Sequence, residues 1–218
     1  SSEKCVVFHN SLDPYFDTSK NLMIEEKLIQ KHQIKPDDTI LITLTRLVSS
    51  EKYKGYDKVI KALAKINTHH TKYKYLILGK YDDSEYKRVN QLIAELNLQN
   101  QVILGGYIAD DEISSYFNLA HLFVMPSQKE GFGIVFIEAM ACGITAIGGN
   151  VDGTVDALKN GELGYLINPD DQKSLIEILN KELIIGDKKE NKQALQEKVQ
   201  AIFGYPQYKN QIAHLFLN

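Results

Sequence analysis

The sequence predicts an α/β protein built on a six-stranded, mostly parallel sheet with helices packed on both of its faces. The main observation is that short apolar or β-branched runs alternate with segments of helical spacing between residues 39 and 184. A chain of 218 residues, of which 44% are hydrophobic, is also long enough to bury a sizeable core. Strands that alternate with helices in this way favour parallel pairing, and the helices then cover both faces of the sheet.

Six apolar runs are the expected strands. The clearest is TILITLT at 39–45, which is rich in the β-branched residues that buried strands favour. Several runs stop at glycines, among them Gly79, Gly105-Gly106 and Gly148-Gly149. The expected strands span residues 39–45, 73–78, 102–104, 121–125, 144–147 and 164–167. A shorter run at 5–8 is interpreted as a strand or an extended linker.

The expected helices lie between and around these strands. In 56–68, for example, Val59, Ile60 and Leu63 recur at helical spacing. In another, Asp110-Asp111-Glu112 place negative charge in the first turn, where the helix dipole favours it. The expected helices span 20–33, 56–68, 84–97, 110–120, 134–142, 152–159 and 171–184, and the tail is helical from 188 to 203 and again up to 217.

The composition excludes several classes of function. The net charge is −3 and the Lys and Arg residues are scattered, so nothing indicates a nucleic-acid-binding surface. No apolar run approaches the ~18 residues of a membrane-spanning helix. The two cysteines, Cys5 and Cys142, are interpreted as unpaired thiols, which is consistent with a reducing cytosol.

In an open parallel sheet, ligands bind beyond the carboxyl ends of the strands. The unusual loops of this chain all fall at that edge, so together they are expected to form a cleft. They span 46–55, 79–83, 105–109, 126–133 and 148–153.

The most informative stretch is Glu130–Gly143, which indicates a loop that leads into a short helix. Gly131 and Gly133 flank one aromatic residue and let a ligand approach the backbone, although both could be simple turn glycines. The helix start offers unpaired N–H groups to an anion. From 134 to 142 every residue except Glu138 is apolar, so the helix is expected to be buried on nearly all sides. Glu138 is then either a core carboxylate satisfied by backbone hydrogen bonds or an acceptor for a ribose 2′,3′-diol.

Two cations are expected to face this helix start. Arg46 follows the first core strand and Lys54-Gly55 closes the same loop, so the pair could clamp a diphosphate. Either one alone could be an ordinary surface cation. Tyr107 and Ile108 follow the third strand and could flank a nucleobase or only pack the loop. The six histidines show no metal-ligand spacing, and neither a Walker-type loop, a G-x-S-x-G elbow nor a G-x-G-x-x-G fingerprint is present.

These segments resemble a known family. The series Pro126-Ser127-x-x-Glu130-Gly131-Phe132-Gly133-x-x-x-x-Glu138-Ala139-Met140-Ala141-Cys142-Gly143 resembles the signature of the retaining glycosyltransferases of glycosyltransferase family four, in the glycogen-synthase-like clan. Arg46-Leu47 with Lys54-Gly55 is similar to that family's basic pair, across a longer loop than usual. VILGGY at 102–107 and the stretch 148–164 also match, so the resemblance covers roughly residues 39–180.

The resemblance implies an architecture. Members have two Rossmann-like domains facing across a cleft, the GT-B fold, and this chain resembles only the second, donor-binding domain. Residues 1–19 would be the linker from a missing N-terminal acceptor domain, 20–203 the donor-binding domain, and 204–218 a helix that crosses back onto the first domain.

The resemblance also implies roles for residues. Arg46 and Lys54 would hold the diphosphate and stabilise the leaving nucleotide, and Glu130 would bind the transferred sugar. The implied donor-binding residues are Gly131, Phe132, Gly133, Ile134, Val135, Glu138, Tyr107 and Ile108. The donor would be a UDP- or GDP-linked sugar, and no metal or other cofactor is implied. The reaction would proceed with retention in polysaccharide or glycolipid synthesis, in the cytoplasm or at the inner face of the membrane, where the full-length protein could associate peripherally.

Two other functions stay open. A nucleotide-sugar epimerase of the same architecture would carry a different set of acids and histidines around its cleft, which the sequence does not show. A non-catalytic nucleotide-sugar-binding module is disfavoured because the basic pair and both glutamates are present. The chain alone is expected to bind nucleotide weakly and to transfer no sugar, because the acceptor face is missing.

Overall fold

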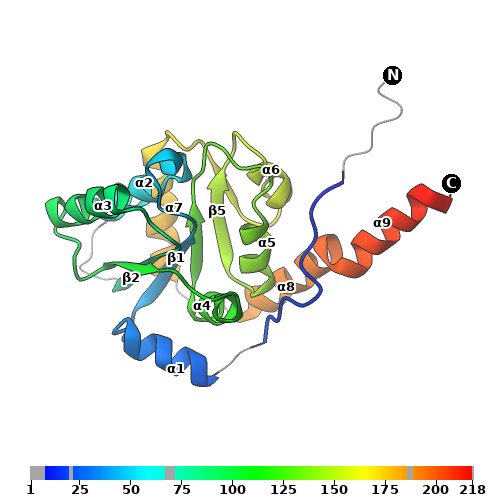
Figure 1. The fold of residues 1–218 in the computed structure, drawn as a ribbon, viewed down its shortest axis with the longest axis horizontal. Helices are drawn as coiled ribbons and strands as arrows, with labels where there is room; N and C mark the ends of the chain where they lie inside the picture. The colour runs from blue at the N-terminus through cyan, green and yellow to red at the C-terminus, as the bar shows by residue number, and fades with distance from the viewer. Residues whose placement is uncertain (1–7, 20–21, 67–71, 186–188, 218) are drawn as a thin grey trace.

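The computed structural model describes residues 8–19, 22–66, 72–185 and 189–217, and its centre is one parallel sheet (Figure 1). The strand order is β3-β2-β1-β4-β5-β6, and every recorded pair of neighbouring strands is parallel. The strands are β1 Thr39–Leu44, β2 Tyr73–Leu78, β3 Val102–Gly106, β4 Leu122–Met125, β5 Thr145–Gly149 and β6 Tyr165–Ile167. The predicted six-stranded sheet is therefore confirmed.

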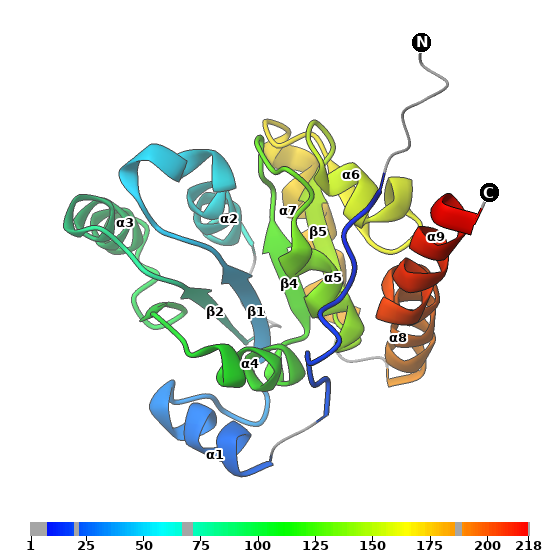
Figure 2. The same ribbon diagram turned by 45° about the vertical axis from the view of Figure 1, so that its right-hand side comes forward.

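Helices cover both faces of this sheet, as predicted. The α-helices are α1 Leu22–Lys31, α2 Tyr56–Leu63, α3 Asp83–Glu95, α4 Ile113–Leu119, α5 Ile134–Ala141, α6 Thr154–Ala157, α7 Gln172–Ile185, α8 Lys189–Phe203 and α9 Tyr205–Leu217. Short 3₁₀ turns occur at η2 Ser49–Lys54, η3 Asp110–Glu112 and η4 Lys159–Gly161. In Figure 2, α2, α3 and α7 lie on one side of the strands, whereas α5 and α8 lie on the other.

The core forms two clusters because side chains alternate across each strand. Ile40 and Ile42 of β1 face the cluster shared with α1, α4, α5 and α8, whereas Leu41 faces the cluster shared with α2, α3 and α7. In the first cluster the ring of Phe123 packs edge-on against Phe136 of α5, with centroids 5.1 Å apart. This packing fixes α5, and with it the loop that precedes α5.

Several predicted boundaries were wrong at glycines. β3 continues through Gly105-Gly106, where Gly106 has a φ of 73° and pairs with Leu78 across a register shift. β5 continues through Gly148-Gly149, because both glycines pair with β6. At Gly149 a Cβ would lie 1.9 Å from the carbonyl oxygen of Ser127, so the glycine permits a close backbone approach.

Helix α2 ends at Leu63, five residues before the predicted end. In the 5–8 run, interpreted as a strand or an extended linker, Phe8 lies in no regular element and residues 5–7 lie outside the described residues.

Residues 8–12 pack against α8 and α9. The Leu12 amide donates to the Phe203 carbonyl at 2.8 Å, and the rings of Phe8 and Tyr208 lie 6.0 Å apart. Helix α9 projects from the rest of the domain (Figure 1). Within the described ranges, none of the helices has both the length and the apolar character needed to cross a bilayer.

Candidate functional site

The carboxyl ends of β1, β4 and β5 bring three loops together. β1 and β4 are neighbours in the sheet although their chain connections lead to opposite sides of it, which makes this edge the topological switch point. The Gln128 amide donates to the Tyr53 carbonyl at 2.9 Å, and the Gly153 amide donates to the Glu130 carbonyl at 2.9 Å. The loops after β1, β4 and β5 are therefore bonded to one another directly.

Lys54 and Glu130 meet at this edge. The Lys54 ammonium forms an ion pair with Glu130 Oε1, and the two side chains are only 13% and 15% exposed. Lys54 Nζ also lies 5.5 Å from the centroid of the Tyr53 ring. We expected the loop that carries Arg46 and Lys54 to face the loop before α5. For Lys54 this is what the structure shows, because its ammonium contacts Glu130 of that loop.

Arg46 occupies a different place. Its guanidinium pairs with Glu51 of the same loop, and its side chain is 71% exposed. Among the recorded contacts it touches neither Lys54 nor Glu130, so the two predicted cations do not form a preassembled clamp. Arg46 is free enough in solvent for its fork to turn toward a ligand at the edge.

The two glycines of the Glu130 loop serve different purposes. Gly133 has a φ of 84°, and a Cβ there would lie 2.7 Å from Cδ2 of Phe136. A Cβ at Gly131 would meet nothing within 4 Å. Packing and backbone conformation therefore require glycine at 133, whereas at 131 the protein itself imposes no such requirement.

The start of α5 is open to solvent. Ile134 is 43% exposed and Val135 is partly exposed, and no side chain caps the helix. The prediction that this helix is buried on nearly all sides is wrong for its first turn, which lies at the sheet edge. The Phe136 amide donates to the Gly133 carbonyl at 2.9 Å, so the amides of this turn that an anion could contact are those of Ile134 and Val135. The Phe132 ring, in contrast, is buried and packs 5.7 Å from the Phe203 ring, so only its backbone faces the edge.

Glu138 lies partly buried on α5, and its carboxylate, unlike its backbone carbonyl, has no recorded hydrogen bond or ion pair with the described residues. The alternative of a core carboxylate satisfied by backbone groups is therefore not what this part of the structure shows. Burial raises the pKa of Glu138 to about 6, and the nearby carboxylates of Asp13 and Asp110 add to the shift. The ionised form of a partly buried carboxylate without a hydrogen-bond partner is stabilised by a ligand that donates hydrogen bonds to it.

The two residues after β3, Tyr107 and Ile108, differ in exposure. Tyr107 is 61% exposed, with Lys80 Nζ 5.0 Å from its ring centroid, whereas Ile108 is 4% exposed and belongs to the core. Of the two, only the Tyr107 ring is accessible to a ligand. Cys142 is buried and outside any disulfide, and burial raises its pKa to about 12. Cys5 lies outside the described residues.

Sequence reasoning missed Asp152. One carboxylate oxygen accepts from the Thr154 amide at 3.0 Å, the usual contact of an aspartate before a helix. The other accepts from the Glu130 amide at 2.7 Å and so fixes the Glu130 loop. The first contact was visible in the sequence as a helix start, but the second joins loops 22 residues apart and left no local pattern.

Such a sheet, with a helix start and a Lys–Glu pair at its switch point, defines a Rossmann-like ligand-binding domain. The chain belongs to the group 1 glycosyltransferases, because the model of that family, Glycosyl transferases group 1, matches residues 24–199. This confirms the resemblance at the level of the group, while membership of family four and the retaining mechanism stay predictions.

Individual relatives agree with this family. N-acetyl-alpha-D-glucosaminyl L-malate synthase of Bacillus anthracis is 32% identical over 140 residues, which cover 64% of this chain and 35% of that protein. The capsular polysaccharide biosynthesis glycosyltransferase CapM of Staphylococcus aureus is 30% identical over 167 residues, which cover 74% of this chain and 40% of CapM. The chain thus spans less than half the length of these relatives.

Solved glycosyltransferases share the fold. The crystal structure of Anabaena Alr3699/HepE in complex with UDP superposes with a TM-score of 0.82 and 25% identity, covering 99% of this chain and 58% of that one. The structural neighbours are glycosyltransferases of the GT-B architecture, and this chain corresponds to a little over half of the HepE chain.

Proposed function

We propose that this chain is the donor-binding part of an enzyme that transfers a sugar from a nucleotide diphosphate to an acceptor hydroxyl with retention of configuration. The contact between Lys54 and Glu130, beside the open start of α5, carries the proposal. It sets a cation for the diphosphate, a carboxylate for sugar hydroxyls and the positive end of a helix dipole within one site.

The Lys54–Glu130 pair can bind a ligand without separating. An ammonium group has three donors and a carboxylate has about four acceptor positions, so each partner keeps capacity after pairing with the other. Lys54 would bind and stabilise the leaving diphosphate while Glu130 accepts hydrogen bonds from the transferred sugar. Arg46 would reach the diphosphate from the solvent side, where its planar fork can bind two phosphate oxygens.

The remaining donor contacts follow the same edge. Backbone N–H groups from Gly131 to Val135 would contact sugar and phosphate, and Glu138 would accept both hydroxyls of the ribose. The exposed Tyr107 ring would stack on the base. We place UDP first among the donor nucleotides, with GDP second, because the HepE neighbour is a UDP complex. The cations and the α5 dipole would do the work of a metal, so we propose a metal-independent site.

The acceptor would come from the rest of the protein. We propose that an N-terminal domain faces this one, because the relatives and the HepE neighbour are longer than this chain. On its own this chain would bind the donor and transfer nothing. The name of CapM supports a role in polysaccharide or glycolipid synthesis, which we place in the cytoplasm or at the inner face of the membrane.

Calorimetry of the 218-residue chain with UDP, GDP and ADP tests this proposal. We expect at least one to bind, and Glu138→Ala to weaken it about 10- to 150-fold, because a hydrogen bond to a charged group contributes about 1.5–3 kcal/mol. Glu177→Ala, on the exposed part of α7, is the matched control and should leave the affinity unchanged. If none of the three nucleotides binds to the folded protein, the proposed function is wrong.

A further inference from the structure

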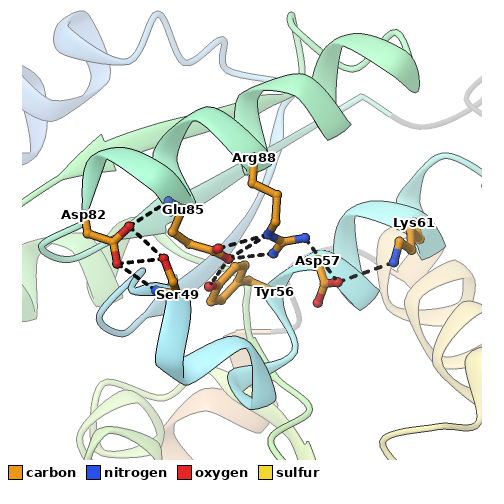
Figure 3. Close-up of polar contacts among 7 residues, drawn as sticks. All are labelled: Ser49, Tyr56, Asp57, Lys61, Asp82, Glu85 and Arg88. Atoms are coloured by element: carbon orange, nitrogen blue, oxygen red, sulfur yellow. Dashed lines mark hydrogen bonds and ion pairs between the residues drawn. The ribbon is translucent and has the colours of Figure 1, made fainter.

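The segment that carries Lys54, residues 48–57, is anchored at its beginning by the loop before α3. The Asp82 carboxylate accepts from the Ser49 amide at 2.7 Å and from the Ser49 hydroxyl at 3.0 Å. It also accepts from the Glu85 amide at 2.7 Å and so caps α3 (Figure 3). One side chain therefore joins the start of the helix to the start of the Lys54 segment.

A second anchor lies at the end of the segment. The Tyr56 hydroxyl donates to Glu85 Oε1 at 2.6 Å, and Arg88 donates to the same carboxylate from Nε and Nη2 at 2.6–3.0 Å (Figure 3). Tyr56 is 0% and Glu85 1% exposed. Arg88 Nη1 also lies 3.7 Å from Asp57 Oδ2. The buried carboxylate thus has a neutral donor on one side and a charged fork on the other, as a buried charge requires.

The segment between the two anchors has little room to move. Gly55 has a φ of 81°, and a Cβ there would lie 2.5 Å from the Pro126 carbonyl oxygen. From the same loop as Pro126, the Gln128 amide donates to the Tyr53 carbonyl at 2.9 Å. Lys54 lies two residues from Tyr56, so a displacement of the Tyr56 ring would be passed along the backbone to the Lys54 ammonium.

We propose that Tyr56, Glu85 and Arg88 form a positioning network that holds the Lys54 ammonium in place for the donor diphosphate, an inference that rests on the proposed function. None of the three side chains contacts Lys54 or Glu130 directly. They act by fixing the backbone on which Lys54 stands, and this is what preorganised electrostatic stabilisation of a leaving group needs.

The test compares two tyrosine substitutions. Tyr56→Phe removes only the hydroxyl that reaches Glu85. The matched control is Tyr165→Phe on β6, where the hydroxyl donates to Glu182 at 2.8 Å and accepts from Lys181 at 2.9 Å, on the side of the sheet that carries α7. Calorimetry with UDP and UMP, or with GDP and GMP if the guanine nucleotide binds, measures both variants. Glu85→Gln is a stronger variant, and Tyr56→Phe decides the question if Glu85→Gln does not fold.

We expect Tyr56→Phe to weaken diphosphate binding roughly 2- to 30-fold, the usual range for a residue that acts through a network, with a smaller effect on the monophosphate. Tyr165→Phe should change neither affinity. If Tyr56→Phe weakens both nucleotides equally, or changes only the unfolding temperature, the positioning role is refuted.

A separate readout distinguishes failure of this inference from failure of the proposed function. Amide hydrogen exchange at Lys54, Gly55 and Tyr56 needs no ligand. If the unaltered protein binds no nucleoside diphosphate, the proposed function fails. Faster exchange at these amides in Tyr56→Phe, but not in Tyr165→Phe, would still support the anchoring network. Unchanged exchange at these amides would refute it.

Discussion

Alanine at Gly131 and at Gly133 should separate a glycine that the ligand needs from one that the fold needs. Gly133→Ala places a side chain at a φ of 84°, which costs about 1–2 kcal/mol. Its Cβ would also lie 2.7 Å from Cδ2 of Phe136, and forcing an extra methyl into packed surroundings costs about 1–3 kcal/mol. The sum of about 2–5 kcal/mol is a large part of a typical stability of about 5–15 kcal/mol.

Gly131→Ala should behave in the opposite way. Gly131 is exposed, is not among the positive-φ glycines, and its added Cβ would meet nothing within 4 Å. The stability should therefore change by less than about 1 kcal/mol. If the donor lies against this backbone, the same methyl should weaken nucleotide binding about tenfold or more, because it takes space that the ligand occupies.

Thermal unfolding and calorimetry with UDP or GDP measure the two effects. For a chain of this length, about 2–5 kcal/mol corresponds to a fall in Tm of about 4–20 °C for Gly133→Ala. Gly161→Ala is the control for backbone strain alone, because Gly161 has a φ of 93° but its Cβ would lie 3.9 Å from its nearest neighbour, Leu166. If Gly131→Ala lowers Tm as much as Gly133→Ala, or leaves nucleotide affinity unchanged, the argument for close ligand approach at 131 is wrong.

Two further predictions concern pH. Because the pKa of Glu138 is raised to about 6, nucleotide affinity should be constant above about pH 7 and fall by up to about tenfold per pH unit below 6. Calorimetry should show a shallower fall in Glu138→Gln, because only the nucleotide itself would still titrate in that variant. Equal slopes in the two proteins would contradict a role for the ionised carboxylate. The pKa of His32 is lowered to about 4 by burial and by Lys31, so its contribution to stability is complete above the unfolded-state value of about 6.5 and is lost as pH falls from there toward 4. Urea unfolding at pH 7 and 4.5 should therefore show His32→Gln losing about 2–3 kcal/mol less than the unaltered protein, and an equal loss would show that His32 is protonated in the fold.

The sheet could be predicted because its determinants are local. A run such as TILITLT is typical of a strand buried on both faces, and its alternation with helices that show their own period favours a parallel sheet covered on both sides. Boundaries failed at Gly106 and Gly149, because pairing with Leu78 and with Ile167 continues each strand past the glycine, and these partners are distant in the sequence. The exposed start of α5 also escaped prediction, since apolar residues at 134 and 135 give no indication that the sheet edge leaves them uncovered.

Candidate residues at this edge, apart from Asp152, could be proposed from sequence, but the contacts among them could not. Arg46 and Lys54 looked equivalent, and the structure separates them. Arg46 is 71% exposed and pairs with Glu51, which is only 11% exposed, whereas Lys54 and its partner Glu130 are both largely buried. The difference depends on the turn at Gly55, whose left-handed φ and contact with Pro126 set the direction of the segment. Such information lies in contacts between residues far apart in the chain, and no local pattern contains it.

The charge pattern of the edge restricts what kind of anion it can bind well. Both predicted cations already have carboxylate partners, whereas Lys129 and Lys80 lie 6.0 and 5.0 Å from the centroids of the Tyr53 and Tyr107 rings. At the Lys54–Glu130 pair itself, attraction comes from the spare N–H donors of Lys54 and from the exposed first turn of α5, whose effects are short-ranged. Glu130 repels a bare phosphate placed beside Lys54, but it gains from hydroxyl groups at the same place. If the proposed function is correct, this pair should bind a diphosphate joined to a hydroxyl-bearing sugar better than a diphosphate alone.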